Sequence, residues 1–286
     1  MLDPQLKELR ELLDLEPIER NLFRGTSPRN GRDRIFGGQV MAQALVAAYR
    51  TVEGRSAHSF HSYFLRPGDP NTPILYQVDR IRDGKTFTTR RVIAIQKGEA
   101  IFHFEGSFCV AEKGYAHQLP IEMPDGPDGP SYEDEVRAEI ARHAPAIEYD
   151  DRRFDLPIEV RTEGGLHLFD PAIRPPRTRT WCRAKGALPD DEWLHQAVLA
   201  YASDLTLLVS AILPHPIGMT GARSASLDHA MWFHRPFRAD EWLFYDQESP
   251  ISDRARGFAR GAFYTRSGEL VASCAQEGMI RYRPRR

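Results

Sequence analysis

Cysteine is scarce in this sequence of 286 residues: there are three, Cys109, Cys182 and Cys274, far apart in the chain. Three such thiols give no disulfide framework, and the absence of a C-x-x-C motif argues against a structural zinc site. Reduced cysteines are typical of cytoplasmic proteins, so we expect this compartment. We also expect no signal peptide, because the first residues carry charges and no apolar core.

A basic excess is missing as well, since the formal net charge is −2. Proteins that bind nucleic acid usually carry a clear positive charge, so we expect no nucleic-acid partner. No Gly-x-Ser-x-Gly motif is present, which disfavours an α/β-hydrolase triad. The pair Gly37-Gly38 lacks the third glycine of a dinucleotide-binding fingerprint, and we expect no cofactor and no metal.

One apolar run, residues 193–213, approaches the length of a membrane span. It carries His195, Gln196 and Asp204, so we predict a buried core helix and no membrane partner. A carboxylate inside such a helix costs free energy, and burial raises its pKa and makes it a better base near neutral pH. Asp204 is therefore the first candidate catalytic residue. The competing interpretation is a half-exposed carboxylate at a break in the helix.

Part of the sequence is written twice, with an offset of 169 residues. The pairs are Phe64 and Phe233, Arg66 and Arg235, Pro67 and Pro236, Tyr76 and Tyr245, and Arg91 and Arg260. The offset becomes 170 at Gly98 and Gly268. This period is far longer than the repeat of a solenoid and matches a small domain. The plainer explanation is two strand-rich stretches that merely look alike, because strand and turn chemistry is repetitive.

Hydrophobic periodicity predicts an amphipathic helix over residues 4–15 and a buried, alanine-rich helix over 40–49 that the two glycines open. Strands are expected at 58–65, 73–82, 86–97 and 100–110, and again at 224–235, 240–249, 255–265 and 269–281. Further strands over 157–186 have no evident match in the first copy.

Each copy therefore reads as one buried helix followed by an antiparallel sheet that curls around it, which is an α+β fold. We predict an N-terminal domain over residues 1–115, a turn-rich linker over 116–160 and a C-terminal domain over 161–286. Only the second copy holds the buried acidic residue, so we expect one active site in each chain.

Two polar residues lie in otherwise apolar strands, Ser226 and Gln276. A hydroxyl and an amide can hold a water molecule without competing for its proton. Together with Asp204 they would form a site for direct hydrolysis, although their spacing alone does not show that they converge.

Long motifs resemble those of the acyl-CoA thioesterase II family over essentially the whole chain. They are residues 15–25, Phe36-Gly-Gly-Gln-Val, residues 58–69, Tyr201-Ala-Ser-Asp-Leu, residues 227–237 and Ala275-Gln-Glu-Gly. The resemblance implies a double hotdog fold, two tandem repeats of an antiparallel sheet wrapped around a central helix. It also implies a catalytic set that falls on Asp204, Ser226 and Gln276. Many members carry Thr at the position of Ser226, and the hydroxyl is kept.

The resemblance implies hydrolysis of fatty acyl-CoA to a free fatty acid and coenzyme A. Asp204 would take a proton from a water held by Ser226 and Gln276, and backbone N–H groups at a helix start would stabilise the oxyanion. Neither a metal nor a covalent serine is needed. Direct attack by Asp204 to give an anhydride is the mechanistic alternative. Acyl-CoA is the expected partner, and the family implies a homo-oligomer, a dimer or a tetramer.

Two other functions stay open, a non-catalytic acyl-CoA-binding module and a hotdog-fold acyl-CoA hydratase. A hydratase would use an Asp/His pair, and none lies near Asp204 in the sequence. We interpret His58, His61, His229 and His234 as polar groups satisfied within strands rather than as catalysts. Gln39 is a candidate for substrate contact at the helix start, and no arginine is assigned to the CoA phosphates.

Overall fold

The computed structural model describes residues 3–28, 32–143, 145, 150, 152 and 154–282, except the side chains of 219 and 220. Its helices are α1 (Pro4–Leu13), α2 (Gly37–Tyr49), α3 (Tyr132–His143), α4 (Glu192–Ser203), α5 (Val209–Ile212) and α6 (Gly218–Gly221). The strands of the N-terminal half are β1 (Glu16–Glu19), β2 (Leu22–Gly25), β3 (Ser56–Phe64), β4 (Ile74–Asp83), β5 (Phe87–Gln96) and β6 (Glu99–Cys109). Those of the C-terminal half are β7 (Ile158–Thr162), β8 (Arg177–Ala184), β9 (Ala222–Ser226), β10 (Asp228–Phe233), β11 (Leu243–Asp253), β12 (Arg256–Thr265) and β13 (Leu270–Tyr282).

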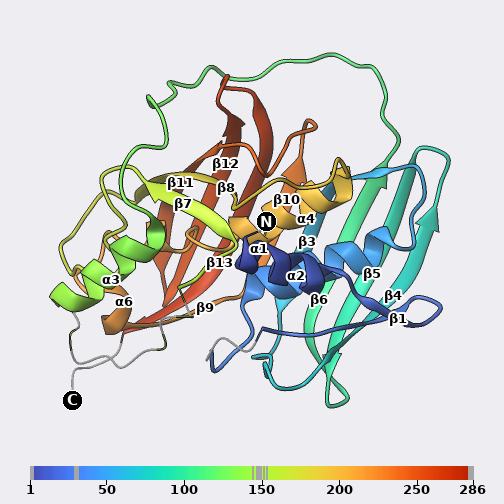
Figure 1. The fold of residues 1–286 in the computed structure, drawn as a ribbon, viewed down its shortest axis with the longest axis horizontal. Helices are drawn as coiled ribbons and strands as arrows, with labels where there is room; N and C mark the ends of the chain where they lie inside the picture. The colour runs from blue at the N-terminus through green and yellow to red at the C-terminus, as the bar shows by residue number, and fades with distance from the viewer. Residues whose placement is uncertain are drawn as a thin grey trace.

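The strands join into one antiparallel sheet in the order β1-β2-β4-β5-β6-β3-β10-β13-β12-β11-β8-β7, and β9 also pairs with β13. This order is symmetric about the pair β3–β10: β4, β5 and β6 in one half correspond to β11, β12 and β13 in the other. Figure 1 shows the halves side by side, with β3 and β10 between them. The offset of 169 residues is therefore a structural repeat.

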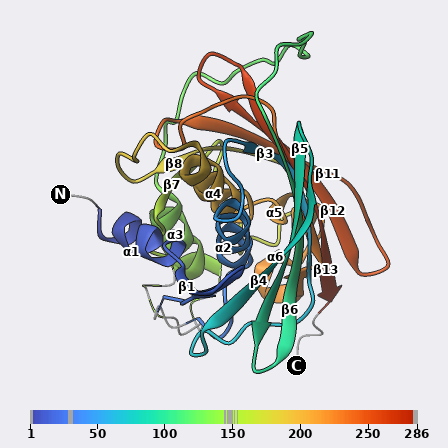
Figure 2. The ribbon, with the colours of Figure 1, turned by 90° about the vertical axis from the view of Figure 1, so that its right-hand side faces the viewer.

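Helices α2 and α4 lie together in the hollow of the curved sheet, and α1 and α3 lie on their far side (Figure 2). Helix α2 is buried along nearly its whole length, because alanine and valine cover most of its circumference. Leu45 of α2 and Leu199 of α4 belong to one hydrophobic core that extends through both halves. Among the described helices, none is both long and apolar enough to cross a membrane.

The expected single helix over 193–213 was wrong, because α4 ends at Ser203 and only a short helix, α5, follows the turn. Ser203 Oγ lies 2.9 Å from the carbonyl of Ala200, a local contact that competes with the helix. Thr206 donates to Gln247 on β11 at 2.8 Å. These polar side chains find partners that the helical periodicity does not reveal, and Asp204 becomes the C-cap of α4.

The strands expected over 157–186 do have a counterpart, which corrects the sequence-based interpretation. Strands β8 and β7 extend the sheet beyond β11 as β2 and β1 extend it beyond β4. The match was missed because β1 is exposed at all four residues and shows no alternation. The division into two domains with a linker over 116–160 stays a prediction, and β7 begins within that linker.

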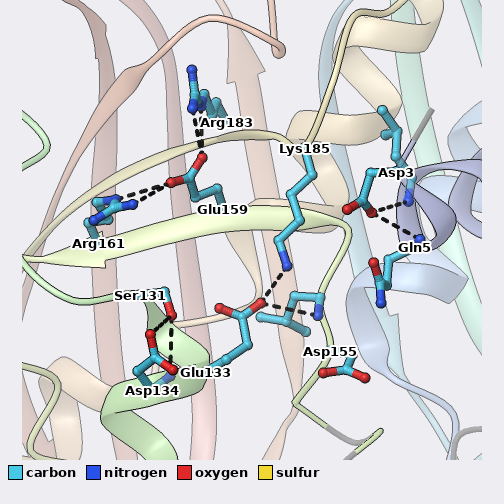
Figure 3. Close-up of polar contacts among 12 residues, drawn as sticks. Asp3, Gln5, Ser131, Glu133, Asp134, Asp155, Glu159, Arg161, Arg183 and Lys185 are labelled. Atoms are coloured by element: carbon cyan, nitrogen blue, oxygen red, sulfur yellow. Dashed lines mark hydrogen bonds and ion pairs between the residues drawn. The ribbon is translucent and has the colours of Figure 1, made fainter. Parts of the chain in front are cut away.

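Charged side chains cover the outer strand of the C-terminal half (Figure 3). Glu159 on β7 accepts from Arg161 at 2.7 Å and from Arg183 on β8 at 2.8 Å. Lys185 binds Glu133 of α3 at 2.7 Å. Charges on an edge strand discourage pairing with another chain, so this end of the sheet is protected.

Candidate active site

Asp204 lies where the end of α4 meets the beginning of α2. Its carboxylate interacts with the backbone N–H of Gly38, in the first turn of α2. The residue that precedes α2, Phe36, provides no side-chain cap. The first N–H groups of a helix lack intrahelical partners and carry partial positive charge, so they favour a carboxylate in this position.

Ser226 and Gln276 lie beside this carboxylate. Ser226 Oγ is 3.4 Å from Asp204 Oδ1, and Gln276 Nε2 donates to the same oxygen at 3.1 Å. Gln276 Nε2 is also 2.5 Å from Ser226 Oγ. Ser226 ends β9, and Gln276 points to the buried face of β13. The structure thus brings together all three residues that the sequence singled out, from three separate elements.

The environment shifts the acidity of Asp204. Burial raises its pKa to about 6, while hydrogen bonds from Gln276, Gly38 and Ser226 and the charge of Arg32 oppose this rise. All of these opposing groups favour the ionised form. Asp204 is therefore a carboxylate at neutral pH, and its pKa is close enough to neutrality for it to accept a proton from water.

A cavity of about 350 Å³ opens next to Ser226 and Gly37. Its apolar lining includes Ile35, Val40, Phe64, Leu65, Ile101, Phe102 and Leu227. Larger hollows of about 670 and 770 Å³ lie elsewhere, around Trp242 and Lys185, and contain none of the three site residues. Of these three cavities, the smaller one has an apolar wall and reaches the Asp204 cluster through Ser226.

The corresponding place in the N-terminal half has lost the cluster. The register of β3–β6 matches those of β10–β13 and β9–β13, so Gly106 takes the place of Gln276 and Ala57 that of Ser226. Helix α2 ends with Arg50 as its C-cap, where α4 has Asp204. The described residues hold one such cluster per chain.

The remaining candidates are occupied elsewhere. His58 and His234 contact serine hydroxyls at 2.8 and 2.9 Å, and His61 packs edge-on against Trp232. The amide of Gln39 is buried and donates to Thr26 and Ser27, each at 3.0 Å, so it does not face Asp204.

The sequence did not predict the roles of two groups at the site. The backbone N–H of Gly38 was anticipated only as an unnamed helix-start donor for the oxyanion, and here it serves Asp204. His229 lies across from Gln276 on the neighbouring strand, a contact that only the register of the sheet reveals. Among the described residues, no cluster of three or more His, Cys, Asp or Glu side chains could hold a metal ion.

Comparison with known proteins gives consistent matches. The family models described as "Acyl-CoA thioesterase" and "Acyl-CoA thioesterase N-terminal domain" match residues 151–279 and 26–109. Acyl-CoA thioesterase 2 of Haemophilus influenzae is 38% identical, over 97% of this chain and 98% of that protein. Human acyl-coenzyme A thioesterase 8 is also 38% identical, over 96% of this chain and 88% of that protein.

Solved structures agree. The acyl-CoA thioesterase II TesB2 of Mycobacterium marinum has a TM-score of 0.79 and 40% identity, over 97% of this chain and 98% of that one. A hotdog-fold protein of unknown function from Alicyclobacillus acidocaldarius has a TM-score of 0.75 at 17% identity, over 96% and 98% of the two chains, and shows the fold alone. The predicted double hotdog α+β fold is confirmed.

Proposed function

Because the chain belongs to the acyl-CoA thioesterase family and is an acyl-CoA thioester hydrolase, we propose that it cleaves fatty acyl-CoA with a water molecule activated by Asp204. The observation that carries this proposal is a carboxylate with a pKa of about 6, held by two polar side chains and a helix start beside an apolar cavity. The products are a free fatty acid and coenzyme A.

The proposed reaction begins with a water molecule next to Asp204, Ser226 and Gln276. Asp204 takes its proton while the oxygen attacks the thioester carbonyl carbon. The tetrahedral intermediate carries a negative oxygen, and the partial positive charge at the start of α2 suits this charge. When the intermediate collapses, the carbon–sulfur bond breaks, and the proton held by Asp204 passes to the leaving thiolate of coenzyme A.

The cavity beside Ser226 suits an acyl chain, because aromatic and branched side chains form its wall. Val40 follows Gly37 by about one turn of α2, so part of the apolar wall and the helix start beside Asp204 belong to one helix. The exposed guanidinium of Arg34 lines the same cavity and offers charge for an anionic group of coenzyme A.

The test is thiol release from acyl-CoAs of increasing chain length by wild type, Asp204→Asn, Ser226→Ala and Ser226→Thr. Asp204→Asn should lower kcat by about 10²–10⁴-fold, the usual contribution of a positioned base. Ser226→Thr should stay near wild type because it keeps the hydroxyl, whereas Ser226→Ala should lose activity. Asp190→Asn is the control, because that carboxylate is exposed and pairs with Arg238 away from Asp204. Near-full turnover by Asp204→Asn would sink the proposal.

Direct attack by Asp204 predicts a different fate for oxygen atoms. A single turnover in ¹⁸O-labelled water should place the label in the fatty acid if water attacks the thioester. If an anhydride forms and water then attacks the Asp204 carboxyl carbon, the label should appear in the protein instead. Label found by mass spectrometry in the peptide containing Asp204 would establish the anhydride pathway.

The proposal includes assembly into a homo-oligomer, a dimer or a tetramer, in the cytoplasm. Light scattering after size exclusion measures the mass directly. A monomer at working concentration would contradict the assembly without affecting the proposed chemistry.

A further inference from the structure

Two buried polar atoms beside the site make no hydrogen bond of normal geometry with the described residues. They are Oε1 of Gln276 and Nδ1 of His229. Both side chains are almost fully buried, with exposures of 1% and 0%. Ala230 pairs with Ala275 across β10 and β13, so His229 and Gln276 are the next cross-strand neighbours, and both point to the buried face. Unsatisfied buried polar atoms are costly, so this pair requires an explanation.

The Gln276 amide must have one orientation for the site to function. Its Nε2 faces Asp204 Oδ1 at 3.1 Å, and an ionised carboxylate only accepts hydrogen bonds. A flipped amide would turn its oxygen toward the carboxylate and replace attraction with repulsion. The contacts with Asp204 and Ser226 favour the correct orientation, but a donor is also needed to hold the other end of the amide. The ring of His229 is the group placed to do so.

We propose that His229 is a positioning residue whose Nδ1–H donates to Gln276 Oε1 and fixes the amide with Nε2 toward Asp204. Its importance for turnover rests on the proposed function of Asp204. In this arrangement the imidazole is neutral, and its Nε2 accepts a hydrogen bond. Ser203 Oγ lies 3.0 Å from that Nε2 and 2.9 Å from the carbonyl of Ala200, and the proposal requires its single proton to point to Nε2. The chain of hydrogen bonds runs from Ser203 through His229 and Gln276 to Asp204, the residue that follows Ser203.

Other contacts hold His229 in place for this role. Ser62 Oγ donates to its backbone carbonyl at 2.7 Å, and the ring of Phe60 stacks on the imidazole. Burial lowers the pKa of His229 to about 4 against the opposing effect of a hydrogen bond with Gln276, so the ring is neutral near neutral pH. A neutral ring has one N–H, and Nδ1 is where the proposal requires it.

Loss of this support should change the acidity of Asp204. A freed Gln276 amide would present its oxygen to the carboxylate for part of the time, and the pKa of Asp204 would rise. The other charged and titratable groups that face Asp204 remain: Arg32, Tyr201 of α4, Tyr245 of β11 and Cys274 of β13. A rise in the pKa of Asp204 would therefore come from the changed orientation of the Gln276 amide.

Two variants separate the two ring nitrogens. The side-chain amide of His229→Asn lies near the position of Nδ1 and keeps a donor toward Gln276, whereas that of His229→Gln lies near the position of Nε2. We expect His229→Gln to lower kcat about tenfold or more, to leave KM nearly unchanged and to move the acid limb of the pH profile upward. His229→Asn should recover most of kcat and the wild-type limb. His229 does not line the acyl cavity, so KM should be unaffected.

Equal losses in both variants with an unmoved acid limb would overturn the proposal, as would wild-type behaviour of His229→Gln. Asp204→Asn is measured in parallel: if it keeps turnover, the proposed function fails, and if it collapses while His229→Gln is unaffected, only this inference fails. Nitrogen-15 NMR of the wild-type protein needs no variant. It should show His229 neutral and protonated on Nδ1, and protonation on Nε2 would refute the assignment.

Discussion

Gly37 passes so close to Asp204 that a β-carbon on Gly37 would lie 2.8 Å from the carboxylate Oδ2. The same carbon would lie 2.9 Å from the ring of Phe64. The backbone of α2 is therefore one wall of the site, and no side chain fits between helix and carboxylate. A glycine is needed here because of this close approach and not because of its backbone conformation, since the φ angle of Gly37 lies outside the left-handed region.

The first prediction concerns this wall. Gly37→Ala should lower kcat/KM at least tenfold, because the methyl group displaces Asp204 or Phe64. Stability should change little, since alanine in place of glycine normally stabilises by about 0.4–1 kcal/mol, which offsets part of the strain. The control is Gly114→Ala, where a β-carbon meets nothing within 4 Å. Steady-state kinetics and thermal unfolding of both variants test it, and wild-type turnover by Gly37→Ala would contradict it.

The second prediction is the pH dependence of activity. Asp204 acts as a base only when ionised, and burial holds its pKa at about 6. The rate constant kcat/KM should therefore rise with pH through about 6 and then level off. Gln276→Leu removes a hydrogen bond that favours the ionised form, so its acid limb should lie at higher pH. A limb near the usual carboxyl value of 3.8 in wild type would argue against a buried base.

The sequence alone predicted most of the strands and the three polar residues of the site, but not their arrangement. The strand expected over 86–97 corresponds to β5, Phe87–Gln96. It could be predicted because period-two alternation is a local signal in the sequence. The break after Ser203 was not predictable, because it depends on partners such as Gln247, far along the chain. Polar side chains in apolar surroundings marked Asp204, Ser226 and Gln276 individually.

Their convergence was available only through family resemblance. Asp204 and Ser226 are 22 residues apart, and Ser226 and Gln276 are 50 apart. Bringing them together requires the register of β9 on β13 and the end point of α4, and both are set by tertiary packing. Tertiary packing also sets the cross-strand pairing of His229 with Gln276. The sequence therefore indicated only a satisfied polar group at His229.

The third prediction links the site to stability. A carboxyl whose pKa rises on folding makes the folded protein less stable as pH increases from about 4 to about 6, because the folded state holds the proton more tightly than the unfolded chain. The difference between 3.8 and about 6 corresponds to about 3 kcal/mol. Asp204→Asn removes this cost, so its free energy of unfolding should exceed that of wild type by up to this amount at neutral pH.

Near pH 4 the two proteins should unfold with similar free energies, because Asp204 is then protonated in the folded state. Urea unfolding at both pH values measures the difference. An asparagine variant that is less stable than wild type at neutral pH would show that Asp204 is a structural anchor rather than a residue kept at a cost.

The fourth prediction tests where the acyl chain lies. Val40 is buried on α2 and lines the cavity of about 350 Å³ beside Ser226. Val40→Phe fills part of this space, so kcat/KM should fall more steeply for long acyl-CoAs than for short ones, and the preferred chain length should become shorter. Val46→Phe is the matched control: it is the same change six residues further along α2, at a buried residue outside this cavity. Generic damage to the core would depress all substrates equally in both variants. An unchanged chain-length profile in a folded Val40→Phe protein would place the acyl chain elsewhere, while leaving Asp204 as the base.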